Sequence, residues 1–251
     1  MQIVHCSKFR DREGNLLPEA RKEAPKALGQ DWKVMMEAQD FVAQGLAQYL
    51  DDAYVLLRNV TLTGLTHDAD LIIVGPTGLW TLEVAYLKGL FKVDGVNWMS
   101  YTSKLEFETV EPNLASHVRE NAQALFDFLR EKKFSVPWVN PVIMLANSQI
   151  DVRTEEAAVA IIRPDGIEQY VAENILPVEP ALSPDEAINV AEAIIALGEP
   201  DEKDGEDIKK ASRFLGMTRP QWAVIAILAL IDICVLGGFA FLVARDTLLG
   251  P

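Results

Sequence analysis

The sequence predicts an α/β domain, built from a mixed β-sheet flanked by helices, followed by one transmembrane helix near the C-terminus. Two observations support this fold class. Short apolar and β-branched runs alternate with longer segments in which apolar residues recur every three or four positions, as in α/β domains. In addition, residues 222–244 are almost uninterruptedly apolar, which is typical of a membrane-spanning helix.

The first half of the chain alternates between the strand and helix patterns. Residues 1–30 are charged and poorly patterned, and we interpret them as an arm with one strand at residues 2–6. Residues 31–50 are expected to form a helix, because Ala38, Val42 and Leu46 recur at a spacing of four. Strands are expected at residues 54–62, 71–74, 79–84, 90–93, 97–101 and 105–109.

The second half continues this alternation up to residue 198. The pattern predicts a long amphipathic helix at 113–131, strands at 140–146 and 158–162, and a short helix at 165–174. Ser183 and Pro184 suit the start of a last helix, because serine caps helix N-termini and proline fits the first turn. Residues 31–198 are therefore expected to form one domain.

The apolar stretch after this domain predicts a single membrane-spanning helix over residues 220–245. Its central 23 residues (222–244) would span ~35 Å as a helix, which exceeds the ~30 Å bilayer core. The preceding linker (199–219) is acidic and then basic, whereas the short tail (246–251) carries little positive charge. The positive-inside rule then predicts a single-pass protein of the cell membrane with its domain in the cytoplasm.

Two features of this predicted helix bear on function. Trp222 is expected to anchor the helix at the membrane interface. Asp232 lies within the span, where a charge costs several kcal/mol unless it is paired, and Gly237 would let another helix approach closely. We therefore expect Asp232 and Gly237 to contact a partner helix or a second copy. The alternative is an acid that stays protonated in a helix serving only as an anchor.

Charge and cysteine content narrow the range of functions. The net charge of −14 disfavours nucleic acid as a partner, because non-specific binding requires a basic surface that displaces counterions. The two cysteines, Cys6 and Cys234, lie in the N-terminal segment and in the predicted span, so a disulfide between them is not expected. A reducing compartment is consistent with this distribution.

An acidic hairpin is the most informative feature of the chain. A short apolar strand follows Asp70, Gly75-Pro76-Thr77-Gly78 predicts a turn, and a second strand ends at Glu83. A hairpin would bring Asp70 and Glu83 to the same open end, with carboxyl oxygens roughly 4 to 6 Å apart, where they can share a divalent cation. Such a cation can polarise a phosphodiester and lower the pKa of a bound water.

The pattern around this hairpin extends along the chain. Its residues are Asp70, Val74-Gly75-Pro76, Gly78, Glu83 and Lys88-Gly89, followed by Trp98 and a helix that opens near Glu111-Pro112-Asn113. The pattern resembles the nuclease-related domain family (NERD), a branch of the restriction-endonuclease-like PD-(D/E)XK superfamily. The resemblance implies a restriction-endonuclease-like mixed sheet and Mg²⁺-dependent phosphodiester hydrolysis, with Asp70 and Glu83 as metal ligands.

The chain departs from the family pattern at three site positions. Ala85 stands where the family has its catalytic lysine, two residues after Glu83 and therefore on the same face of the strand. His117 stands where the family has a glutamine, and Gln39 where it has a glutamate. Lys88 and His117 are the candidates to replace the missing lysine.

Three functions remain open from the sequence. The first is a membrane-anchored nuclease-related protein with a degenerate site, which binds nucleic acid or a protein partner with weak or no catalysis. The second is an active Mg²⁺-dependent nuclease acting on DNA or RNA, in which Asp70 and Glu83 hold the metal. The third is a membrane adaptor without a nucleic-acid role, in which Asp70 and Glu83 are solvated acids at strand ends.

Overall fold

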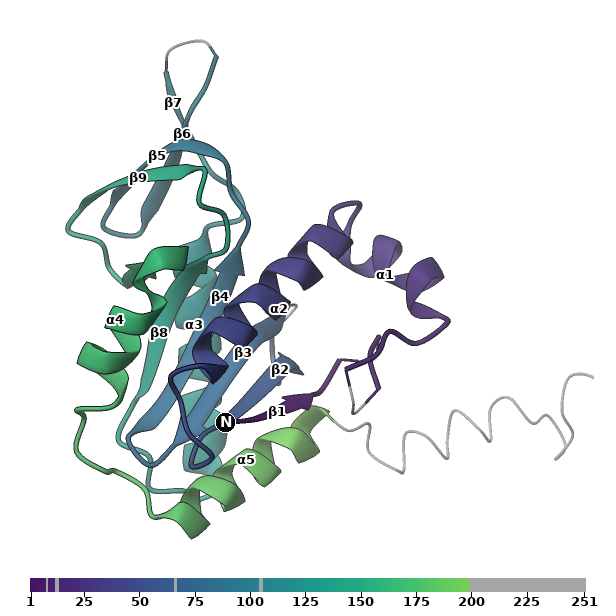
Figure 1. Cartoon of the computed structure of the whole chain (residues 1–251), viewed down its shortest axis with the longest axis vertical. Helices are drawn as coiled ribbons and strands as arrows, with labels where there is room; N and C mark the ends of the chain where they lie inside the picture. Colours follow the sequence, from purple (N-terminus) through teal and green to yellow (C-terminus); the bar gives the residue numbers. More distant parts are fainter. Residues whose placement is uncertain (8, 12–13, 66, 104–105, 199–251) are drawn as a thin grey trace, which may run out of the picture. The chain divides into compact units, whose positions relative to one another are not determined.

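A computed structural model of the chain describes residues 1–7, 9–11, 14–65, 67–103 and 106–198 (Figure 1). The predicted linker, transmembrane helix and tail, including Trp222, Asp232 and Gly237, lie outside the described residues. Within the described ranges, the structure contains no helix that is both long and apolar enough to cross a membrane.

The described residues form a mixed six-stranded sheet with the order β1-β2-β3-β4-β8-β10. Strand β2 is antiparallel to β3 and β3 to β4, whereas the β1–β2, β4–β8 and β8–β10 pairs are parallel. The predicted mixed α/β architecture is therefore confirmed. The strands are β1 (Gln2–His5), β2 (Val55–Thr61), β3 (Asp68–Gly75), β4 (Gly78–Ala85), β8 (Val139–Leu145) and β10 (Ala160–Ile162).

A second, four-stranded sheet lies at one end of the described domain, with the order β7-β6-β5-β9 (Figure 1). Its strands are β5 (Gly89–Asp94), β6 (Asn97–Tyr101), β7 (Phe107–Thr109) and β9 (Ile150–Glu155). The sequence did not predict β9, because charged residues alternate with its apolar ones and most of the strand is exposed at the sheet edge. Parallel pairing with β5 orders this segment as a strand.

Helices cover both faces of the six-stranded sheet. Helix α2 (Trp32–Ala47) and the segment made of α4 (Ile167–Tyr170) and the π-helical turn η2 (Val171–Ile175) bury one face. Helices α3 (Leu114–Glu131) and α5 (Pro184–Gly198) bury the other face. The short helix predicted at 165–174 is therefore divided, since the 3₁₀ turn η1 (Pro164–Gly166) precedes α4.

Strand β3 explains why the central strands are continuously apolar. Leu71 and Ile73 pack under α2, whereas Ile72 and Val74 pack under α3 and α5, so each side chain of this run is buried. The strand ends at Gly75, where a Cβ atom would collide with the ring of Tyr54. This close approach requires glycine at the turn of the acidic hairpin.

The N-terminal segment contributes two elements to the domain. Strand β1, which matches the strand expected at residues 2–6, forms an edge of the six-stranded sheet. Helix α1 (Ala20–Leu28) was not expected, and its Ala20 and Ala24 pack with Phe9 and Trp32. Strand β1 therefore extends the sheet, and helix α1 packs against the start of α2.

Candidate functional site

Asp70 and Glu83 face each other at the open end of the β3–β4 hairpin. The ladder pairs Leu71 with Leu82, so the next opposing pair in the same register is Asp70 and Glu83. Residues that oppose each other in an antiparallel ladder share a face of the sheet. The Glu83 side chain is 14% exposed, so this acid pair lies at the margin between core and solvent.

The environment of Asp70 makes its ionised form costly. Burial raises the pKa of the Asp70 carboxyl well above its usual range, and the charge of Glu83 raises it further. Two hydrogen bonds partly offset these effects: Val84 N donates to Asp70 Oδ2 (2.8 Å) and Gln39 Nε2 donates to Asp70 Oδ1 (2.7 Å). The pair is thus a concentration of negative charge that a cation would stabilise.

Gln39 is held in place by a residue that the sequence analysis did not single out. Asn59 Nδ2 donates to Gln39 Oε1 (3.1 Å), and Gln39, on α2, is buried. Asn59 adopts a left-handed conformation (φ 54°) between Arg58 and Val60, which pair with Leu71 and Ala69. Asparagine tolerates this conformation better than most residues, and this preference is the only sequence signal that could have indicated its role.

His117 lies beside Glu83. Its Nδ1 atom is 3.9 Å from Glu83 Oε1, which is an ion-pair distance and too long for a good hydrogen bond. The Glu83 carboxylate raises the pKa of His117, and burial only partly offsets this increase. Helix α3 therefore brings a basic group to the acid pair from the face that Glu83 occupies.

A second histidine, His67, stacks on His117. The ring centroids are 4.3 Å apart and the planes differ by 14°. The Nε2 atom of His67 is buried and has no hydrogen-bond partner. Sequence reasoning would treat His67 as a solvated loop residue, because nothing in the sequence indicates that the loop before β3 folds against α3.

The position of the missing lysine is filled by a buried methyl group. Ala85 is 3% exposed and packs in the cluster that contains Ala115 and Val118 of α3. It lies on the same side of β4 as Glu83, so a lysine at this position would start from the face of the acid pair. The structure shows no cationic side chain at position 85.

Lys88 lies elsewhere in the structure. It is exposed in the connection between β4 and β5, and its Nζ atom lies 5.6 Å from the centre of the Tyr86 ring. Among the described residues, no ion pair joins Lys88 to Asp70 or Glu83. Of the two candidates to replace the lysine, His117 is thus the one that contacts the acid pair.

The donor set suits a hard divalent cation. Magnesium is commonly held by one or two carboxylates, with water and substrate phosphate completing its shell, and Asp70 and Glu83 provide such a pair. Within the part of the chain that the structure describes, no group of three or more His, Cys, Asp and Glu side chains is arranged to hold a metal.

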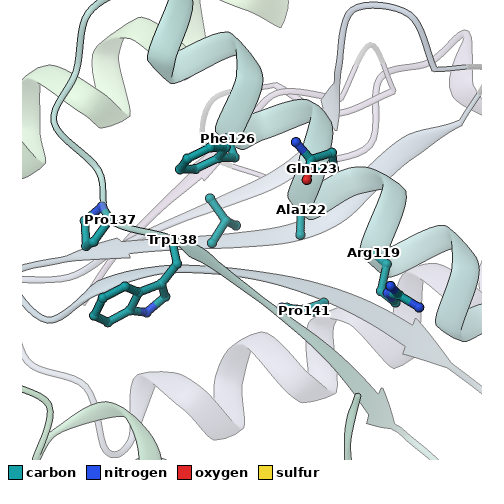
Figure 2. Close-up of a pocket in the computed structure, with 8 residues that line it drawn as sticks. Arg119, Ala122, Gln123, Phe126, Pro137, Trp138 and Pro141 are labelled. Carbon is teal, nitrogen blue, oxygen red and sulfur yellow. The ribbon is translucent and has the colours of Figure 1, made fainter. Parts of the chain in front are cut away.

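A separate hollow of about 320 Å³ lies between α3 and the start of β8 (Figure 2). Trp138 is 48% exposed beside this hollow, and Phe126 and Arg119 contribute from α3. None of the residues that line it belongs to the acid pair or its hydrogen-bond partners. The hollow is therefore distinct from the candidate site.

Comparisons with known proteins bear on the family. No curated protein and no solved structure matches this chain. Residues 36–146 match the family model described as "Nuclease-related domain". This match runs from within α2 to the residue after β8, and it includes Gln39, Asp70, Glu83 and His117. The chain therefore carries a nuclease-related domain (NERD) over residues 36–146, for which the PD-(D/E)XK superfamily is the general fold context.

Proposed function

We propose that this domain binds nucleic acid through a divalent cation held by Asp70 and Glu83, with weak or no cleavage. The observation that carries this proposal is the like-charged pair itself. Burial and the charge of Glu83 raise the pKa of Asp70, so the pair destabilises the fold unless a cation or a proton offsets its charge. A costly carboxylate pair at the end of a hairpin is typical of a functional site.

The proposed cation is Mg²⁺, in accord with the family and with the two carboxylates. When bound, it would attract a phosphate oxygen and lower the pKa of a bound water. Residues of the chain then position the carboxylate. Gln39 orients Asp70 through its hydrogen bond, and Asn59 orients Gln39. These neutral amides hold the carboxylate without neutralising its charge.

Weak or absent cleavage is expected because Ala85, on the same face of β4 as Glu83, stands where the family has its catalytic lysine. A lysine at position 85 could orient a water and stabilise the charge that develops on phosphate, whereas a methyl group can do neither. Ala85 is buried against α3, and its methyl group fills the position from which a lysine would extend. The net charge of −14 also opposes tight binding of nucleic acid by the protein surface alone.

A second candidate function is an active nuclease in which His117 replaces the lysine. The observation that favours it is the contact between His117 Nδ1 and Glu83 Oε1, together with the raised pKa of His117. A protonated imidazole beside the acid pair would offer a positive charge and a proton donor. In the third function, an adaptor without a nucleic-acid role, the acid pair would take no part in binding or catalysis.

The location proposed for this activity is the cytoplasmic face of the cell membrane. The proposal depends on the apolar stretch at 222–244 and on the basic residues that precede it. Trp222 would mark the interface, and Asp232 and Gly237 would contact a second helix. All three residues lie outside the described part of the chain.

The experiment that tests the proposal is a binding and cleavage assay of the full chain with Mg²⁺ or Mn²⁺. The substrates are single-stranded DNA, double-stranded DNA and RNA, and the variants are Asp70→Asn and Glu83→Gln. Asp94→Asn is the matched control, because Asp94 is an exposed acid at the end of β5, in the four-stranded sheet.

We expect cation-dependent binding of at least one substrate, lost in both site variants and kept in the control. Slow or undetectable cleavage is expected alongside this binding. Rapid cleavage that requires His117 would favour the second candidate function. Binding that does not depend on the cation, or that persists in both site variants, would overturn the proposal.

A further inference from the structure

Unpaired hydrogen-bonding nitrogens gather at one place in the described domain, on the α2 side of β1 and β2. Eight buried side-chain polar atoms of the described residues lack a hydrogen-bond partner. Half of this set belongs to three neighbouring residues: His5 Nδ1, Arg10 Nε, and Arg58 Nε and Nη2. Buried donors without partners are rare and costly in folded proteins, so a group of them requires an explanation.

The three residues form one cluster, which we call the arginine cluster: His5, Arg10, Arg58 and the carboxylate of Asp40. His5 on β1 is the register partner of Arg58 on β2. Arg58 Nη1 lies 2.6 Å from Asp40 Oδ1, and Arg10 Nη2 lies 3.0 Å from Asp40 Oδ2. Asp40, on α2, thus joins both guanidinium groups.

Gly14 lies against this cluster. Arg10 Nη1 donates to the carbonyl oxygen of Gly14 (2.7 Å), and a Cβ atom at Gly14 would collide with the His5 ring. The positive φ of Gly14 (86°) also favours glycine at this position. Gly14 thus approaches the His5 ring closely, and the Arg10 side chain bonds to its carbonyl oxygen.

The charges of the cluster do not balance. Two guanidinium groups share a single carboxylate, and the Arg58 side chain is only 4% exposed. The pKa of His5 is lowered, first by burial and then by the charges of Arg58 and Arg10, and the carboxylates of Asp40 and Asp11 oppose this effect less strongly. At His5 the two guanidinium charges therefore outweigh the carboxylate charges, although the chain as a whole is strongly acidic.

We propose that the arginine cluster is a binding site for a phosphate group. Guanidinium N–H groups bind phosphate oxygens through short, charge-assisted hydrogen bonds, and the unpaired atoms Arg58 Nε, Arg58 Nη2 and Arg10 Nε supply such donors. The cluster reaches solvent at Asp40, whose side chain is 34% exposed. An anion entering there would satisfy donors that the protein itself leaves unpaired.

The position of the cluster relates this phosphate to the acid pair. Asp40 follows Gln39 on α2, and Arg58 precedes Asn59 on β2, whereas Gln39 and Asn59 form the chain of hydrogen bonds to Asp70. The charge of Asp70 also contributes to the pKa of Arg58. If the proposed function holds, the arginine cluster would bind a phosphate of the same strand that reaches the cation.

The test uses the full chain with ¹⁵N-labelled arginine and follows the Nε–H resonances by NMR during a titration with inorganic phosphate. Chloride keeps the ionic strength constant. Arg10→Gln and Arg58→Lys assign the two signals, and Arg119, an exposed arginine on α3, is the internal control. This arm needs no divalent cation and no nucleic acid, so its result is independent of the proposed function.

We expect saturable shifts of the Arg10 and Arg58 signals without a comparable shift of Arg119. In Arg10→Gln, phosphate affinity measured on the Arg58 signal should fall about tenfold or more, as the loss of a charge-assisted bond predicts. Arg119→Gln should bind phosphate like the parent. If no signal shifts, or if all arginine signals shift in parallel, the unpaired donors bind water and the proposal is wrong.

A second arm identifies the source of the phosphate. A short single-stranded oligonucleotide replaces inorganic phosphate in the same titration. Shifts with both ligands assign the cluster to the backbone of a nucleic acid, and shifts with inorganic phosphate alone assign it to a free phosphate. Arg58→Lys serves as the fallback if Arg10→Gln does not fold, because lysine keeps the charge and removes the unpaired Nε donor.

Discussion

Asp70 and Glu83 repel each other when no cation lies between them, and this repulsion has a measurable consequence for stability. Because the folded-state pKa of Asp70 is raised, the stability that its protonated form contributes is present at low pH and is lost as pH rises through that pKa. The acid pair therefore destabilises the domain at a pH above this pKa in the absence of divalent cations.

The substitution Glu83→Gln should relieve this repulsion. We expect the melting temperature without divalent cations, at a pH above the Asp70 pKa, to rise by roughly 2–4 °C, as ~1 kcal/mol would give in a domain of this size. The gain should shrink as the pH falls and Asp70 is protonated. Thermal unfolding across a range of pH is the measurement, with Asp94→Asn as the control. A melting temperature that is unchanged or lower across the whole pH range would contradict this prediction.

Ala85 allows a direct test of the missing lysine. Ala85→Lys should raise cation-dependent cleavage above that of the parent, because position 85 shares the face of Glu83. The site is buried, so circular dichroism must show that the variant folds. Ala85→Met is the matched control, since it adds a chain of similar length without the charge. If both variants cleave no better than the parent, the changes at Gln39 or His117 limit catalysis, or the domain has no nuclease role.

Sequence reasoning found part of the candidate site, and the remainder has a physical explanation. Asp70 and Glu83 were recognisable because the hairpin pattern places one acid at the end of each strand. His117 was indicated because it stands where the family has a glutamine. Asn59 could not be found, because its role depends on a left-handed backbone within a strand. His67 could not be found either, because stacking on His117 brings together a loop and a helix far apart in sequence.

At the scale of elements, the start of α3 controls where His117 lies. Asn113 caps this helix by accepting a hydrogen bond from Ser116 N (3.0 Å), and its Nδ2 atom donates to the carbonyl oxygen of Val96 (2.9 Å). One side chain therefore caps the helix and joins it to the turn before β6. His117 follows in the first turn of the helix.

The substitution Asn113→Ala should lower the free energy of unfolding by roughly 1–2 kcal/mol, since it removes a helix cap and leaves Val96 without its donor. Urea unfolding measures this loss. Asn113→Ser is the control, because serine keeps the capping oxygen and should recover part of the stability. Equal stability of the parent and the alanine variant would show that the cap contributes nothing to the fold.

The sequence patterns correctly predicted the elements whose apolar residues form an uninterrupted run or a regular period. The strands of the acidic hairpin are continuous apolar runs, α2 and α3 have long apolar periodicities, and each element is confirmed within a few residues. Helix α1 was missed because its segment is highly charged and contains Pro25. Strand β9 was missed because its order depends on pairing with β5, which is distant in sequence.

At the scale of the whole molecule, the sequence patterns could not predict the order of the strands in the sheets. Strand β8 lies beside β4 because α3 carries the chain back across the sheet, as a parallel crossover requires. Strand β1 lies beside β2 although more than forty residues separate them. The arginine cluster depends on this second pairing, which explains why no local motif indicated it.

The membrane anchor is a prediction for the whole chain that the described residues do not test. We expect the full chain to resist alkaline extraction from membranes and a chain truncated after residue 219 to be released. Asp232→Leu should keep the protein in the membrane while reducing crosslinking between copies or to a partner, because interhelical hydrogen bonds contribute only ~0.6 to 2 kcal/mol. Identical crosslinking of parent and variant would show that the helix is only an anchor.

The central claim is that Asp70 and Glu83 share one divalent cation, and titration calorimetry of the full chain with Mn²⁺ tests it most directly. The account predicts one saturable site in the parent, a loss of at least about tenfold in affinity for both Asp70→Asn and Glu83→Gln, and unchanged binding in Asp94→Asn. Equal binding by the parent and both site variants would contradict the claim, because the cation would then be held elsewhere.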